Sequence, residues 1–232
     1  MIAGSELAPG EQPVRVWDLP TRVFHWLLAG LVIFSVISGH IGGNAIVWHM
    51  RSGFAIFTLL AFRLVWGFVG GHWSRFRAFI YAPSTSLRYL RGRSLPHEHH
   101  HVGHNPLGAG SVFALLGILV LQVATGLIAD DEIANTGPLI KYVSSGTSSL
   151  ATGWHKNYGQ WIIVALVTLH VGAIAFYWFR RRQNLVAPMW HGDKHLAADV
   201  PGAIDDGRSR TIALVVVLVC ALGVAGVVRL GG

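Results

Sequence analysis

Apolar residues along the chain gather into five long runs that polar and charged residues separate. The runs cover residues 23–41, 46–69, 107–129, 155–179 and 211–230, and each is long enough to cross about 30 Å of hydrocarbon as a helix. Only the sequence "GGNA" separates the first two runs, so we expect them to form an antiparallel helical hairpin. The pattern therefore predicts an all-α integral membrane protein with five transmembrane helices.

Composition agrees with a membrane location and excludes several other classes of protein. Only 12% of the 232 residues are charged and the mean hydropathy is +0.49, whereas about a quarter of the residues in a soluble domain are charged. The net charge of +7 does not indicate nucleic-acid binding, because the basic residues lie between the apolar runs and form no single basic face. A single cysteine, Cys220, excludes an internal disulfide and a covalent C-x-x-C-H haem attachment.

The distribution of Lys and Arg predicts the orientation in the membrane. Thirteen of the 18 basic residues lie before the first run, between the second and third, or between the fourth and fifth. Because basic flanking segments are retained in the cytoplasm, we expect a cytoplasmic N-terminus and an external C-terminus. We divide the chain into a cytoplasmic tail (1–14), a four-helix bundle (15–182), a cytoplasmic linker (183–210) and a fifth, C-terminal transmembrane helix (211–232).

Four histidines at the ends of the runs form two groups at matched depths. This topology places His25 and His170 near the cytoplasmic level and His49 and His155 near the opposite level. We call them the inner pair and the outer pair. His155 and His170 are separated by about 22 Å along one helix and by about 60° around it, so both can face the same interior. His40 is expected to be a solvated edge residue, and the other eight lie in loops or at membrane edges: His72, His97, His99, His100, His101, His104, His191 and His195.

Several interpretations of the four histidines stay open at this point. Any one of them alone is best explained as an interfacial residue that bonds to a neighbour. A transition-metal site or a proton relay is less favoured, because the runs contain almost no Asp or Glu. Two cross-helix pairs suit a haem iron, which takes one imidazole on each face. Ala29, Gly53 and Gly159 lie four residues after a histidine and would leave room for a porphyrin, although close helix packing explains them equally well.

Motifs across residues 14–195 resemble the bacterial di-haem b-type cytochromes, which include the membrane subunits of nickel-iron hydrogenases and the bacterial cytochrome b561 type. The similar segments are "WDLPTRVFHW", "WHMRSGFAIFTLLAFRLVWGFVGG", "GHNPLGAGSVFALLGILVLQVATGL" and "NLVAPMWHGDK". The resemblance implies a four-helix bundle in the bacterial inner membrane that binds two haem b groups through histidines on helices one, two and four. It also implies a periplasmic redox protein or hydrogenase-like subunit and a membrane quinone as electron partners. The fifth span lies outside the minimal core of this family.

Three arginines are candidates to hold the haem propionates, because Arg forms bidentate contacts with carboxylates. Arg51 follows the outer histidine His49, Arg22 precedes His25, and Arg63 lies deep enough to reach the inner level. Arg63 could equally extend to the cytoplasmic interface. The "HEHHHVGH" stretch favours a solvated loop over a metal site.

The function predicted from these features is electron transfer across the membrane between a periplasmic redox partner and the quinone pool. Two alternatives stay open. One is a self-contained quinone-linked oxidoreductase such as a superoxide oxidase, and the other is a haem-free transporter or scaffold.

Overall fold

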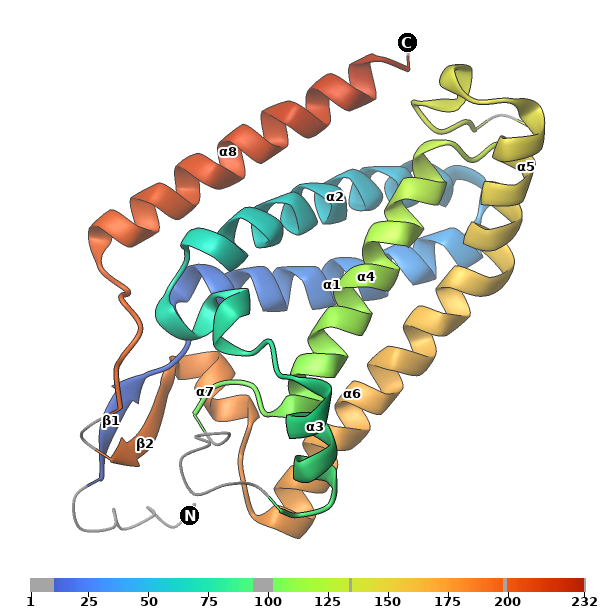
Figure 1. Cartoon of the computed structure of the whole chain (residues 1–232). Helices are drawn as coiled ribbons and strands as arrows, with labels where there is room; N and C mark the ends of the chain where they lie inside the picture. The colour runs from blue at the N-terminus through green and yellow to red at the C-terminus, as the bar shows by residue number, and fades with distance from the viewer. Residues whose placement is uncertain (1–10, 94–101, 134, 198–199, 232) are drawn as a thin grey trace.

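The computed structural model describes residues 11–93, 102–133, 135–197 and 200–231 (Figure 1). In these residues five helical segments are long and apolar enough to cross a membrane, which confirms the predicted all-α membrane fold. They contain α1 (Leu19–Ile41), α2 (Ile46–Val69), α4 (Pro106–Leu127), α6 (Gln160–Arg181) and α8 (Gly207–Arg229). Figure 1 shows α1 beside α2, α4 beside α6, and α8 lying along α2.

The first two spans form the predicted hairpin. Asp18 caps the start of α1 by accepting a hydrogen bond from the backbone nitrogen of Thr21 at 2.8 Å. At the far end the chain reverses through Gly42 and Gly43, whose φ angles of 65° and 52° are unstrained only for residues without a Cβ. A short 3-10 turn, η1 (Gly43–Ala45), then leads into α2.

The fourth span is longer than the apolar pattern predicted. Its helix starts as α5 (Ser145–Trp154), passes through one π turn, η5 (His155–Gly159), and continues as α6. The start is fixed by Ser144, whose hydroxyl accepts from the backbone nitrogen of Thr147 at 3.2 Å. The sequence pattern missed this first part because it is rich in Ser, Thr and Gly. His155 therefore lies inside a continuous helix, at the start of a π turn, and not at its beginning.

The centre of the bundle is α2, which packs against the other spans on two sides. One cluster joins Phe62 and Trp66 of α2 to Phe24 of α1 and Ala213 of α8. A second cluster joins Ile56 and Leu60 of α2 to Leu119 of α4 and Ile163 of α6. Helix α8, which the sequence analysis placed outside the four-helix bundle, thus buries part of its surface against α2. Large apolar side chains on the outer faces of α1, α6 and α8 remain exposed, as a lipid-facing surface requires.

The end of the bundle where α1 begins, which we call the inner end, carries structure that the sequence did not predict. Strand β1 (Glu11–Arg15) pairs antiparallel with β2 (Asp193–Ala197), so the segment before the first span and the linker before the last one form a single ribbon. The short helices are α3 (Pro83–Leu90) and α7 (Val186–His191), with 3-10 turns η2 (His72–Ser74) and η3 (Phe76–Ala78); η4 (Ile140–Tyr142) lies between α4 and α5. Asp205 connects the linker to β1 and to the start of α8 through ion pairs with Arg15 at 2.9 Å and Arg210 at 3.0 Å.

A buried carboxylate joins α1 to α2 and the following loop at the inner end. The side chain of Asp18 is fully buried. Its Oδ1 accepts from Thr21 N at 2.8 Å and Trp66 Nε1 at 3.1 Å, and its Oδ2 accepts from Gly71 N at 3.1 Å and Ser74 Oγ at 2.6 Å. Four neutral donors therefore satisfy this carboxylate.

Candidate functional site

The structure brings the rings of the inner pair together. His25 comes from the first turns of α1 and His170 from the inner half of α6, and their ring centroids lie 6.4 Å apart at an interplanar angle of 53°. Nδ1 of His170 lies 3.5 Å from the hydroxyl of Ser111. Nδ1 of His25 is buried and has no hydrogen-bond partner among the described residues.

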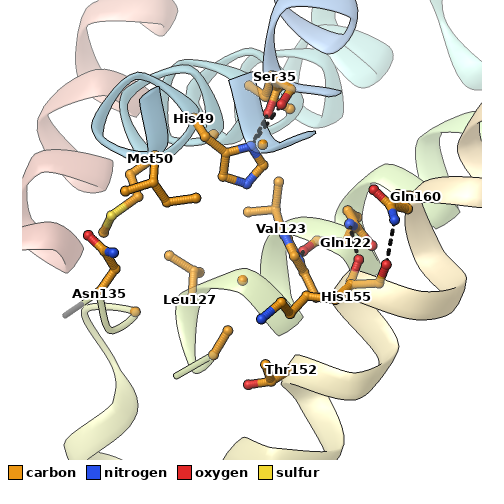
Figure 2. Close-up of a pocket in the computed structure, with 18 of the residues that line it drawn as sticks. Ser35, His49, Met50, Gln122, Val123, Leu127, Asn135, Thr152, His155 and Gln160 are labelled. Atoms are coloured by element: carbon orange, nitrogen blue, oxygen red, sulfur yellow. Dashed lines mark hydrogen bonds between the residues drawn. The ribbon is translucent and has the colours of Figure 1, made fainter. Parts of the chain in front are cut away.

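The rings of the outer pair are also brought together, and here both are held by backbone carbonyls. His49 of α2 and His155 of the π turn have ring centroids 5.8 Å apart at an interplanar angle of 89°. Nδ1 of His49 lies 2.8 Å from the carbonyl oxygen of Ser35 (Figure 2), and Nδ1 of His155 lies 2.9 Å from that of Gln122. A carbonyl can only accept, so each Nδ1 carries the proton and each Nε2 keeps a lone pair for a metal.

The separations within both pairs fit two imidazoles bound to one metal atom. Two metal–nitrogen bonds of about 2.0 Å, with each ring centroid about 1.1 Å behind its nitrogen, put the centroids roughly 6 Å apart. The observed values are 6.4 Å for the inner pair and 5.8 Å for the outer pair. The spacing of both pairs is therefore compatible with two imidazoles that would share one metal atom.

Glycines on the neighbouring helices leave room for the outer rings. A Cβ at Gly39 of α1 would lie 2.9 Å from Nδ1 of His49, and a Cβ at Gly126 of α4 would lie 2.8 Å from Cε1 of His155. Gly53 faces open space, as a porphyrin neighbour would. Gly159 instead lies against the side chain of Gln122, so close helix packing accounts for that glycine.

A cavity of about 450 Å³ opens beside the outer pair, within the roughly 300–1,000 Å³ that small-molecule sites occupy. His49 and His155 both line it, together with residues of α1, α2, α4 and the α5–α6 helix (Figure 2). The inner pair does not border this cavity. At the inner end the fit to a cofactor is instead indicated by buried nitrogen atoms that have no hydrogen-bond partner among the described residues.

The three candidate arginines have different surroundings. Arg51 is exposed, with its guanidinium 4.9 Å from the centroid of the Trp48 ring, and the structure does not bring it to the outer pair. The reason is geometric, since residues two apart on a helix do not face the same side. Arg22 donates to the carbonyl of Trp190 at 2.6 Å and lies 3.8 Å from Asp205, while its buried Nε has no partner within the described ranges.

Arg63 does not extend to the interface. Its side chain is 3% exposed and its guanidinium carbon lies 4.7 Å from the centroid of the Phe76 ring. Nη1 of Arg63 has no hydrogen-bond partner in the described part of the chain. Burial of this cation therefore favours a role inside the bundle over a position at the membrane surface.

Sequence reasoning missed His104, which it assigned to a solvated loop. The ring is packed between Trp17 at 4.7 Å and Phe79 at 4.6 Å, measured between centroids, and its buried Nδ1 has no hydrogen-bond partner in residues that the structure describes. Burial lowers the pKa of His104 to about 3, and the charges of Arg63 and Lys194 act in the same direction. The position just before the N-cap of α4 was the available signal, but burial could not be inferred from it. His97, His99, His100 and His101 lie outside the described residues. His40 is exposed, as predicted.

Five apolar helices with two histidine pairs, each spaced for one metal, define a multi-pass membrane protein of the b-type cytochrome class. The family described as prokaryotic cytochrome b561 matches residues 16–192, and the chain belongs to this family. Haem b is the cofactor that membership in a b-type cytochrome family implies. The resemblance noted from the sequence motifs is thus confirmed.

Three relatives show how far the similarity extends. Each is named a probable Ni/Fe-hydrogenase B-type cytochrome subunit, with the Escherichia coli K12 protein numbered hydrogenase 1. The protein of Bradyrhizobium diazoefficiens is 24% identical, covering 83% of this chain and 90% of the relative. That of Azotobacter chroococcum is 27% identical, covering 85% and 95%, and that of E. coli is 24% identical, covering 67% and 80%. No solved structure matches the chain.

Proposed function

We propose that this protein holds two haem b groups, one between His25 and His170 and one between His49 and His155, and passes electrons across the membrane. The observation that carries the proposal is the pairing itself, with ring centroids 6.4 and 5.8 Å apart near opposite ends of one bundle. The haem irons would supply the one-electron redox change. The fourth span would supply one ligand to each haem, His155 from the π turn and His170 from α6.

The protein's own residues orient the ligands. The carbonyl oxygens of Ser35 and Gln122 fix the tautomer of the outer imidazoles and leave the Nε2 lone pair of each ring for the iron. Packing of Ile56, Leu60 and Ile163 fills the middle of the bundle with apolar side chains. This layer keeps water from the region between the two levels.

The partners we propose follow from the relatives' names and the charge pattern. A hydrogenase-like subunit or another periplasmic redox protein would exchange electrons at the outer pair, and a membrane quinone would be the second partner. The basic inner end would face the cytoplasm of a bacterial inner membrane, with the N-terminus inside and the C-terminus in the periplasm. Arg22 and Arg63 would lie near the propionates of the inner haem. We propose the chain division 1–14, 15–182, 183–210 and 211–232 as its organisation in the membrane.

Electron transfer in sealed vesicles tests this function. The full chain would be inserted into liposomes that enclose ferricyanide, and dithionite, which does not cross the bilayer, would be added outside. We expect the trapped ferricyanide to be reduced faster than in empty liposomes, and this gain to be lost in His49→Ala and in His170→Ala. An equal rate with and without the protein would contradict the proposal.

A further inference from the structure

Besides Nδ1 of His25 and Nε of Arg22, two further buried nitrogen atoms near the inner pair lack hydrogen-bond partners in the part of the chain that the structure describes. They are Nη1 of Arg63 and Nδ1 of His104. Arg63 is 97% buried, since its exposed fraction is 3%. A buried donor without an acceptor costs about 1–3 kcal/mol, and more when the group is charged. The arrangement therefore indicates that an acceptor is missing from this region.

Both groups lie along one aromatic wall. The guanidinium carbon of Arg63 is 4.7 Å from the centroid of the Phe76 ring, Phe76 lies 6.0 Å from Phe79, and Phe79 lies 4.6 Å from the ring of His104. Arg63, His170 and His25 all lie close enough to His104 for an electrostatic interaction with it. The two unpartnered groups and the inner pair thus belong to one neighbourhood.

Among the described residues, Asp18 is the only carboxylate that acts on Arg63, and none acts on His104. Asp18 is the carboxylate that acts electrostatically on Arg63, but its two oxygens accept four hydrogen bonds from neutral donors. Lys194 adds further positive charge nearby. Its Nζ donates to the carbonyl of Val102 at 2.7 Å, and burial lowers its pKa to about 8. In the described part of the chain, cationic groups therefore outnumber the available anions around the inner pair.

We propose that Arg63 and His104 form an anion pocket that binds a carboxylate of the cofactor held by the inner pair. The guanidinium of Arg63 provides a charged N–H donor, and a neutral imidazole at position 104 still provides one N–H. The inference rests on the proposed function and adds His104, a residue outside the set of predicted ligands and arginines.

The test compares haem b with its dimethyl ester, which lacks the carboxylate charges. The full chain carrying His49→Ala, which removes one outer ligand, would be stripped of haem and reconstituted with each compound in turn. We expect the inner site to bind haem b about tenfold or more tightly than the ester, because charge-assisted hydrogen bonds to carboxylates are strong. Arg63→Gln should bring this ratio close to one, His104→Gln should reduce it partly, and Arg63→Lys should retain part of it.

Controls and contrary outcomes separate this inference from the proposed function. The exposed residues Arg77 and His195 provide matched variants, Arg77→Gln and His195→Gln, which should keep the parental ratio. A parental ratio near one, or a ratio that Arg63→Gln and His104→Gln leave unchanged, would overturn the anion pocket while haem binding by the inner pair stands. Equal weakening of both compounds would also overturn it, because that outcome indicates a structural role. Failure of the parental chain to bind either compound would instead contradict the proposed function.

Discussion

Nδ1 of His155, at the start of the π turn, lies 2.9 Å from the carbonyl oxygen of Gln122 on α4. His49 makes the matching contact with Ser35 at 2.8 Å, whereas His25 has no such partner among the described residues. An imidazole that donates from Nδ1 to a carbonyl is a more basic metal ligand, and a more basic ligand stabilises the oxidised iron.

This difference predicts that the outer haem has the lower midpoint potential. The buried cation Arg63 near the inner pair acts in the same direction, because positive charge favours the reduced state. A spectroscopic redox titration of the full chain should resolve two midpoints, and the lower one should vanish in His49→Ala. Loss of the higher midpoint in that variant would contradict the prediction.

Single ligand substitutions should remove haems in pairs. His25→Ala and His170→Ala should each leave about one haem per chain, and the remaining haem should be the same in both variants. His49→Ala and His155→Ala should leave the other one. His195→Ala is the matched control, because His195 is exposed on β2 and does not line the cavity beside the outer pair, so both haems should remain. If His25→Ala and His155→Ala removed the same haem, the proposed pairing would be wrong.

Adding a methyl group at Gly39, beside the outer pair, should weaken haem binding at the outer site alone. In Gly39→Ala the new Cβ would lie 2.9 Å from the ring of His49, which must then shift. Overpacking costs about 1–3 kcal/mol, so we expect the outer haem to bind roughly 5- to 150-fold more weakly. Gly30→Ala lies on the same helix and meets nothing within 4 Å, so it should bind both haems normally. Equal haem affinity in the two variants, measured by titration of the apoprotein, would refute this account of Gly39.

Removing the buried carboxylate at the inner end should destabilise the whole bundle. Asp18→Ala leaves four donors without an acceptor, and we expect a loss of about 3 kcal/mol or more in the free energy of unfolding. The measurement is unfolding of the full chain in detergent. Asp206→Ala, which removes only the exposed N-cap of α8, should cost about 1 kcal/mol. Similar losses in both variants would show that the Asp18 network contributes little.

The attachment of the linker to the bundle should weaken in acid. Burial by itself raises the pKa of Asp205, but the hydrogen bond from Arg210 and the charge of Arg15 outweigh it and hold the pKa below its usual 3.8. The resulting stabilisation is complete above about pH 4 and is lost as the pH falls through the lowered pKa. Proteolysis of the 183–210 segment should therefore accelerate below pH 4 in the wild type. Asp205→Asn should show the faster cleavage already at pH 7, and an unchanged rate there would contradict this role.

Sequence patterns were sufficient to predict the membrane spans and the two pairs in which the four histidine rings lie close together. Apolar runs locate helices because lipid requires them, and the positions of His25, His49, His155 and His170 along antiparallel spans place them at two levels. Features that depend on tertiary packing could not be inferred. The burial of Arg63 depends on the loop that brings Phe76 over it.

Other differences have similar physical causes. The first turns of the fourth span are rich in Ser and Thr, so the pattern of apolar residues did not predict them. The π turn has no apolar pattern of its own. His104 sits among charged and polar loop residues in the sequence, yet Trp17 and Phe79 enclose it in the fold. The β1–β2 ribbon joins segments that are far apart in the chain, so no local pattern predicts it.

The most direct test of the central claim is the haem content and absorption spectrum of the purified full chain. We predict two non-covalent haem b groups per chain, with the sharp bands of low-spin iron on reduction, as two histidine ligands on each iron require. A colourless protein, or one with a single haem that survives all four histidine substitutions, would contradict the account.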